Sequence, residues 1–411
     1  MADAWEWRQY SAHWLVDCCE RHLRVVFPGR RWGGPGPDFR GAVVALSDGT
    51  LVRGDVEIHV RASSWMRHGH ARDAAYQHVV LHVVGLADAM AVTLLGSHVP
   101  TVQLEPWRGP PPVVLPPRSQ WVPCVRSVPA VLSVVRAAGQ ERFRARQARF
   151  EGDLALVEAD QVLWRGVCEA LGFRRNAEPF GRLADAVPWA EAATAVVERG
   201  PVGLAGLLLG RAGLLAEATL PEAHAWRALQ RRCGLRQALG VASWDQRQLR
   251  AANAPAVRCR GLAALAQRWT QPRWSGPAER VLEAVKAAAA SRRPGLWGLV
   301  QVPPWIGRGR AQVVAINVLL PFAAAAGVAE ASALYERLPG EPTNRVVRYM
   351  AAQLGNSVSA AEPVRFRGAL LQQGLLQLFK QTCAARLCER CPARRPGGPS
   401  ATSVVCDSSN G

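Results

Sequence analysis

Lysine is nearly absent from this sequence, since it occurs only at positions 286 and 380. The formal net charge of +18 therefore rests on arginine. An excess of this kind is typical of proteins that bind polyanions, because arginine neutralises phosphates and releases their counterions. A genome-wide bias toward arginine, alanine, glycine and proline explains the same composition without any function. Both explanations remain open, and nucleic acid is the partner that the charge favours.

Long hydrophobic runs are also missing. The longest nearly apolar stretch, residues 313–329, contains Asn317 and Pro321 and is shorter than the roughly 20 residues that a membrane span needs. We expect a buried core helix there and no membrane partner. The first residues lack the basic and then apolar pattern of a secretory signal. Ten cysteines in 411 residues are too sparse for a secreted disulfide framework, so we expect a cytoplasmic protein.

Several sequence motifs with a known mechanism are absent as well. The sequence has no Walker-type phosphate loop, no dinucleotide-binding glycine fingerprint after a strand and no Gly-x-Ser-x-Gly nucleophile elbow. The sequence therefore gives no indication of three kinds of chemistry that use these motifs: nucleotide hydrolysis on a phosphate loop, hydride transfer and serine-hydrolase catalysis.

The first hundred residues carry alternating helix and strand patterns. The apolar spacing in residues 3–27 predicts an opening helix. The Asp48-Gly49 turn between two β-branched runs predicts a hairpin. With a short helix and further strands, the order becomes αβββαβ. The predicted strands are residues 42–46, 50–62, 79–85, 91–95 and 99–104, and the short helix is residues 70–79.

A proline-rich segment then marks a domain boundary. Seven of the 29 prolines lie between residues 106 and 123. Proline removes the donor that helices and sheets need, so the segment is a stiff connector. Beyond it the pattern is helical. We expect an α+β protein with this organisation: an α/β domain at 1–108, a linker at 109–127, a helical domain at 128–395 that ends in a cysteine cluster, and a disordered tail at 396–411.

Two acids and a histidine are placed to meet on the hairpin. The period of two in a strand sends Asp55, Glu57 and His59 to one face. Asp38 stands at the start of the preceding strand, and neighbouring strands lie only about 4.8 Å apart. Asp38 and Glu57 can therefore share a hard cation such as Mg²⁺ or Mn²⁺. His59 can orient or deprotonate a water bound to that cation.

Structural explanations compete with each of these roles. Asp38 can cap a turn, Glu57 can pair with Arg53 or Arg61, and the histidine can be a half-buried side chain with a bonded ring. For Asp38, Glu57 and His59 taken together, we favour the metal site.

A second polar group follows the hairpin. His68, His70 and Asp73 can contact a scissile phosphate or hold a second metal. A turn and a helix start explain His70 and Asp73 equally well. We expect His82, inside an apolar strand, to be a core histidine.

Several stretches together resemble a known bacterial family. They are Gly-Pro-Gly-Pro-Asp38-Phe, Val-Glu57-Ile-His59, Trp65-x-x-His68-Gly-His70, Leu-His82-Val-Val, Asn317-Val-Leu-Leu-Pro321, Gln372-Gln-Gly374-Leu and the late cysteines. This pattern is similar to the family catalogued as domain of unknown function 2851. The resemblance supplies a family without an established activity.

The first domain also resembles the PD-(D/E)XK phosphodiesterase superfamily. That motif places Asp after Pro on one strand and Glu-x-Lys on the next, within an αβββαβ core. Pro37-Asp38 and Glu57-x-His59 match it, with His59 where lysine is expected. The resemblance implies a restriction-endonuclease-like fold, Mg²⁺ or Mn²⁺ on Asp38 and Glu57, and Glu6 as an accessory acid from the opening helix.

The cysteines near the end of the chain form a compact triplet. Cys383, Cys388 and Cys391 can ligate zinc or an iron-sulfur cluster if a fourth ligand is supplied. Cys124 is our first candidate for that ligand and Cys406 the second. The layout is similar to nucleases of the PD-(D/E)XK superfamily that bind a 4Fe-4S cluster. Three reduced cysteines in a surface loop are the alternative.

The sequence therefore predicts a metal-dependent nuclease for DNA or RNA. The alternative from another class is a non-catalytic nucleic-acid-binding or scaffold protein that has lost the lysine. A hydrolase of a small phosphorylated or amide substrate is a third possibility. The sequence indicates no oligomeric state.

Overall fold

A computed structural model of the chain describes residues 5, 15–32, 34–104, 115, 131–245, 253–291, 295–355, 365–385, 387–388 and 391–393. Several predictions fall outside these residues. They concern Glu6, Cys124, Cys406, all of the proposed linker except Leu115, and the proposed tail at 396–411.

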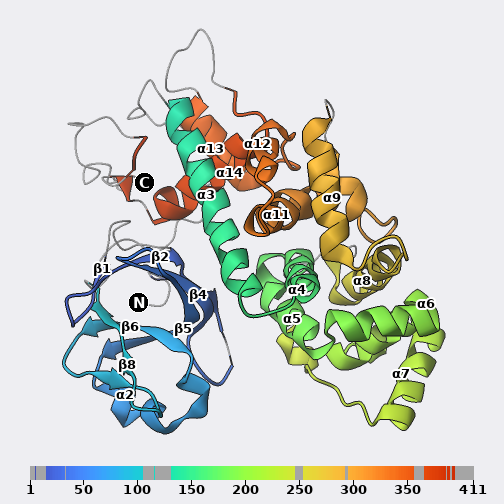
Figure 1. The fold of residues 1–411 in the computed structure, drawn as a ribbon, viewed down its shortest axis with the longest axis horizontal. Helices are drawn as coiled ribbons and strands as arrows, with labels where there is room; N and C mark the ends of the chain where they lie inside the picture. Colours follow the sequence, from blue (N-terminus) through green and yellow to red (C-terminus); the bar gives the residue numbers. More distant parts are fainter. Residues whose placement is uncertain are drawn as a thin grey trace, which may run out of the picture. The chain divides into compact units, whose positions relative to one another are not determined.

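The chain divides into two compact units. One unit is Met1–Ala145 together with Thr343–Gly411, and the other is Arg146–Pro342. The first holds a mixed sheet and some of the helices, and the second is helical (Figure 1). The α+β class predicted from the sequence is confirmed.

The main sheet has the strand order β1-β2-β4-β5-β6-β9, with β3 paired to β4. Strands β1 to β5 run antiparallel to their neighbours, whereas β5, β6 and β9 are parallel. A separate antiparallel pair joins β7 to β8. The strands are β1 Leu15–Val16, β2 His22–Phe27, β3 Arg30–Arg31, β4 Phe39–Leu46, β5 Leu51–Arg61, β6 Val79–Leu86, β7 Ala91–Val92, β8 His98–Val99 and β9 Thr101–Gln103.

The β4–β5 hairpin forms as the Asp48-Gly49 turn predicts. Gly49 adopts a φ of +87°, which glycine reaches without strain, and the Asp48 carboxylate accepts from the Thr50 N–H at 2.9 Å. A β-bulge between Phe39 and Ala42 adds one residue to β4. Asp55 Oδ1 accepts a hydrogen bond from the Gly41 N–H at this bulge at 3.0 Å, so the carboxylate of Asp55 stabilises the backbone of the bulge.

The sheet curls around an apolar core (Figure 1). Its two edges meet where Asp17 bridges Val102 and the Cys18 N–H donates to Thr101 O at 2.9 Å. The Trp5 side chain is fully buried in this core. The remaining buried members are Leu23, Val25, Phe39, Ala42, Val44, Val56, Leu81, Val83 and Val102.

The predicted opening helix is wrong over its second half. Residues 15–16 and 22–27 are strands, because Leu23 and Val25 alternate as buried residues with the exposed His22 and Arg24. The turn between the strands is fixed by Asp17, whose Oδ1 accepts the N–H groups of Cys19 and Arg21 at 2.9 Å each. This alternation covers only a few residues. Over the longer window of residues 3–27 the helical spacing of apolar residues dominates, so the pattern predicted a helix.

A chain segment of short turns crosses from β5 to the parallel strand β6. It contains the helix α2 Ser64–Arg67 and the 3-10 turns η1 His70–Arg72 and η2 Ala74–Tyr76. Trp65 and Tyr76 from this segment are buried with Val79 in a second apolar cluster. The crossover thereby covers the sheet face opposite to the main core.

The rest of the chain is helical. The helices are α3 Val131–Leu154, α4 Ala159–Leu171, α5 Phe173–Ala186, α6 Trp189–Ala212, α7 Leu220–Cys233, α8 Pro255–Trp269, α9 Pro277–Ala290, α10 Arg308–Val314, α11 Leu320–Ala325, α12 Glu330–Arg337, α13 Arg345–Gly355 and α14 Ala369–Gln381. The shorter turns are η4 Leu215–Glu217, η5 Val241–Ser243, η7 Leu296–Leu299, the π-helical η8 Ala315–Leu319 and η9 Cys383–Ala385. Residues 313–329 run through α10, η8 and α11 and are mostly buried, as predicted for a core helix.

Helix α6 is the one described helix long and apolar enough to cross a membrane, by length and composition alone. Its apolar window is 56% buried inside the protein, and Gly200, with ψ of −177°, breaks the helix before Pro201. A core helix passes the same test, so this observation is weak evidence for a span.

Candidate metal centre

The strand register places one acid and one histidine side by side on the covered face of the sheet. Glu57 of β5 pairs with His82 of β6. Their neighbours Val56 and Leu81 point into the main core, so Glu57 and His82 face the crossover segment instead. His82 is fully buried, and its ring lies 5.1 Å from that of Trp65.

Asp38 and Glu57 are cross-strand neighbours. Because Phe39 pairs with Val56, Asp38 stands one step further, opposite Glu57. The Asp38 N–H donates to Glu57 Oε2 at 3.0 Å, and the Ile58 N–H donates to Asp38 Oδ2 at 3.0 Å. Each carboxylate thus accepts a hydrogen bond from a backbone N–H of the opposite segment, at the point where β4 begins.

Burial disfavours the ionised form of both carboxyl groups. It raises the pKa of Glu57 to about 8, and the nearby Asp38 charge adds to the rise. Burial also raises the pKa of Asp38, against the opposing effect of the Ile58 N–H. Carboxylate oxygens are the ligands that hard cations prefer.

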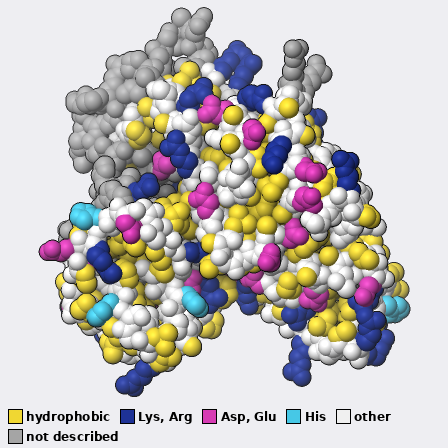
Figure 2. Space-filling model, viewed as in Figure 1, with side chains coloured by type: hydrophobic (Ala, Val, Ile, Leu, Met, Phe, Trp, Pro, Cys, Tyr) yellow, Lys and Arg dark blue, Asp and Glu magenta, His cyan; other side chains and the backbone are white. Residues whose placement is uncertain are grey.

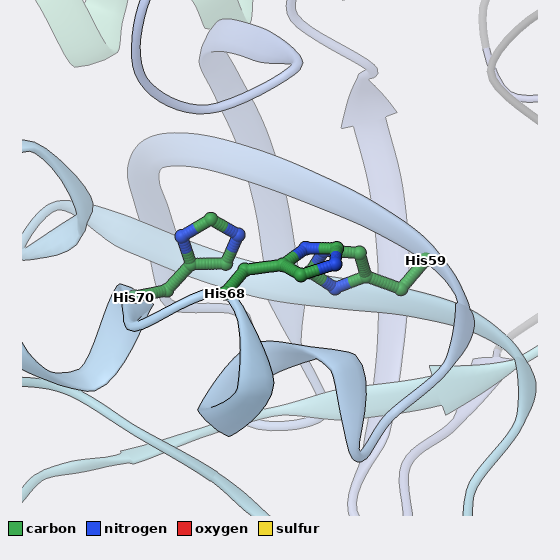
Figure 3. Close-up of side chains that lie close together, drawn as sticks. All are labelled: His59, His68 and His70. Atoms are coloured by element: carbon green, nitrogen blue, oxygen red, sulfur yellow. The ribbon is translucent and has the colours of Figure 1, made fainter.

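Three histidines, His59, His68 and His70, lie close together (Figure 3), and two of them approach the other oxygen of Glu57. His59 Nε2 lies 3.4 Å from Glu57 Oε1 and 3.1 Å from His68 Nδ1, while His70 Nε2 lies 3.4 Å from the same Glu57 oxygen. One ligand atom from each of His59, His68 and His70 falls within 4.8 Å of the others. Within the described part of the chain, this is the one such group of three.

A left-handed glycine lies between two of these histidines. Gly69 has a φ of +78° and separates His68, at the end of α2, from His70, at the start of η1. The imidazole of His70 then stacks on Tyr76, with ring centroids 3.8 Å apart. Asp73 takes a structural role, because its Oδ1 accepts from the Ala75 N–H at 2.8 Å and caps η2.

His82 supports His59 from within the sheet. His59 Nδ1 and His82 Nε2 are 2.9 Å apart. Burial lowers the pKa of His59 to about 4 and that of His82 to about 3, with neighbouring histidines adding to both effects. Both rings are therefore neutral near pH 7, which is the form that binds metals.

The structure thus brings Asp38, Glu57 and His59 together with His68 and His70. The pairing of His82 with His59 was missed, although its place in Leu81-His82-Val83 assigns it to the polar face by alternation. The three late cysteines lie past α14 and are half-buried. There the Cys391 N–H donates to Cys388 O at 3.2 Å. A cysteine-bound metal remains a prediction.

Comparison with known proteins gives a family but no activity. No curated protein and no solved structure matches the chain. A family model described as "Protein of unknown function (DUF2851)" matches residues 1–298, which include the whole sheet and the clustered acids and histidines. The chain therefore belongs to the DUF2851 family of proteins of unknown function.

Proposed function

We propose that this protein is a divalent-metal-dependent phosphodiesterase that acts on DNA or RNA in the cytoplasm. The observation that carries the proposal is the juxtaposition of Asp38 and Glu57 across β4 and β5, with His59 on the same face. The strand order is compatible with the PD-(D/E)XK motif, since β4 and β5 form the antiparallel pair and β6 follows in parallel.

The donor set suits a hard cation. Glu57 and Asp38 are neighbours across the hairpin and offer carboxylate oxygens. Mg²⁺ and Mn²⁺ prefer oxygen ligands. Such an ion, when bound, lowers the pKa of a water and offsets the charge that builds on phosphoryl oxygens.

The side chains of the protein would accept a proton from the attacking water and orient the phosphate. The His59 ring is neutral and lies 3.4 Å from Glu57 Oε1, so His59 Nε2 is placed to accept a proton from an attacking water. His68 lies beside His59 and is exposed, so it can donate a hydrogen bond to a phosphate oxygen. His59 thus occupies the place of the superfamily's lysine.

A nucleic-acid substrate fits the arginine-rich composition. The formal charge of +18 attracts polyanions. On the face drawn in Figure 2, basic side chains are scattered among acidic ones, with no single basic patch over the described residues. We therefore place recognition of the substrate at the site, with the net charge assisting the encounter.

The missing lysine favours one alternative, a non-catalytic protein that binds nucleic acid. No lysine precedes position 286. Such a protein would keep the fold and the binding of DNA or RNA without turnover.

Cleavage assays on the full chain separate these functions. Labelled single- and double-stranded DNA and RNA are incubated with Mg²⁺ or Mn²⁺, and Asp38→Asn combined with Glu57→Gln is compared with wild type. We expect metal-dependent cleavage by wild type alone. The matched control is Asp48→Asn, an exposed aspartate of the same hairpin that caps only its turn.

Equal cleavage by the double variant would rule out the assignment. Salt-dependent binding without cleavage under either metal would select the non-catalytic alternative.

The late cysteines carry a separate proposal. We propose that Cys383, Cys388 and Cys391 bind zinc or a 4Fe-4S cluster. Visible absorption after anaerobic purification would identify the cluster, and one equivalent of zinc that survives loss of the histidines would identify a zinc site.

A further inference from the structure

Four ligand atoms from separate parts of the chain converge beside the acid pair. Glu57 and His59 come from β5, whereas His68 and His70 come from the crossover. Figure 3 shows the three histidine side chains. Glu57 offers Oε1 to this group, while its Oε2 accepts from the Asp38 N–H. The group is rich in nitrogen, in contrast to the all-oxygen pair of Asp38 and Glu57.

Three of the six separations among these atoms match the edges of a tetrahedral coordination sphere. A tetrahedron around zinc, with Zn–N bonds of about 2.0–2.1 Å, has edges of about 3.3–3.4 Å. The separations from His59 Nε2 to His68 Nδ1 and to Glu57 Oε1 are 3.1 and 3.4 Å, and that from His70 Nε2 to Glu57 Oε1 is 3.4 Å. These three edges fit one ion, and the ligand atoms of the three histidines lie within 4.8 Å of one another.

A buried nitrogen points into the group without a hydrogen-bond partner. His70 is 8% exposed, and its Nε2 makes no hydrogen bond. Leaving such a buried atom unsatisfied is unfavourable, because it has lost its hydrogen bonds to water without replacing them. A bound metal would satisfy it, and the stacking of His70 on Tyr76 already holds the ring in the required orientation.

His82 completes the arrangement behind His59. With a metal on His59 Nε2, the Nδ1–H of His59 donates to His82 Nε2, which lies 2.9 Å away. A hydrogen bond of this kind from the second ring nitrogen fixes the tautomer of metal-binding histidines.

We propose that Glu57, His59, His68 and His70 bind a first-row transition metal ion of the zinc class. Imidazole nitrogens favour zinc, iron, nickel and copper over Mg²⁺. The proposal shares Glu57, His59 and His68 with the proposed phosphodiesterase site, and a metal on His59 Nε2 would replace the role of that nitrogen as proton acceptor. It concerns ion binding alone and stands if no cleavage is found.

The test is metal binding by the chelator-stripped full chain. Zinc content is measured by elemental analysis, and affinity by competition with a chromophoric chelator, in the presence and absence of excess Mg²⁺. We expect one equivalent of zinc that Mg²⁺ does not displace and that requires the histidines. Cobalt substituted at this site should show no thiolate charge-transfer band, which separates it from the late cysteines.

Two variants and one control make the assignment specific. His70→Gln removes a buried ligand, and His68→Gln removes an exposed one with little risk to folding. Each should weaken zinc binding at least about 10–100-fold, the loss seen when even a supporting residue is removed. His22→Gln, an exposed histidine on β2, should bind zinc like wild type.

Unchanged zinc stoichiometry and affinity in both variants would overturn the proposal, as would displacement of zinc by Mg²⁺. Failure of the phosphodiesterase proposal looks different, because zinc binding would persist while cleavage is absent under every metal.

Discussion

Replacing Gly69 by alanine tests whether its backbone turn assembles the histidines. Gly69 has a φ of +78°, and a Cβ added there meets no atom within 4 Å, so the cost is backbone strain alone. Placing an L-residue in the left-handed region costs about 1–2 kcal/mol. The stiffer unfolded chain returns about 0.4–1 kcal/mol. The free energy of unfolding should therefore fall by about 1 kcal/mol.

Gly49→Ala is the matched control. Gly49 has a φ of +87° and equally open surroundings, but it lies in the hairpin turn away from the histidines. Both variants should lose similar stability in urea unfolding of the chelator-treated full chain. Zinc affinity in a chelator competition assay should fall in Gly69→Ala alone. Relief of the strain should change the distance of 3.1 Å between His68 Nδ1 and His59 Nε2 and that of 3.4 Å between His70 Nε2 and Glu57 Oε1.

Equal zinc affinities in the two variants would refute the idea that this turn positions the ligands. An unchanged stability of Gly69→Ala would contradict the left-handed conformation itself.

Three further predictions concern other parts of the chain. Gly374→Ala should lower stability by about 1–3 kcal/mol in urea unfolding, because its Cβ would collide with Val135 O where α14 crosses α3, whereas Gly240→Ala, with open space, should not. Thr219→Ala should cost about 1 kcal/mol by the same measurement, since it removes the capping box of α7. In the chelator-treated protein, burial lowers the pKa of His82 from 6.5 to about 3, so the unfolded chain takes up a proton first and stability should fall as pH drops from 6.5 toward 3. The His82→Gln variant should show a shallower fall in thermal melts over this range.

The hairpin was predictable because local chemistry encodes it. Asp48-Gly49 demands a tight turn, and alternation over β5 assigns Glu57 and His59 to one face whatever packs around them. Strands β1 and β2 were not predictable in the same way. They are short, and the bridge from Asp17 to Val102 depends on a contact distant in sequence.

The candidate site shows the same division. Asp38, Glu57 and His59 were placed together by strand period and turn chemistry. The approach of His68 and His70 depends on the φ of Gly69 and on stacking against Tyr76, neither of which leaves a periodic signal. His82 followed the alternation, but its pairing with His59 requires the parallel register of β5 and β6, which only the tertiary fold sets.

Helix α3 depends on partners that the ribosome makes much later. Val131 and Val135 pack against Val347 of α13 and Leu375 of α14, and Arg142 Nε donates to Gln373 Oε1 at 2.8 Å. Residues 155–344 are synthesised between α3 and α13. The apolar side of α3 therefore stays uncovered through most of translation and is a natural target for chaperones, whereas the sheet can close as soon as its last strand has emerged.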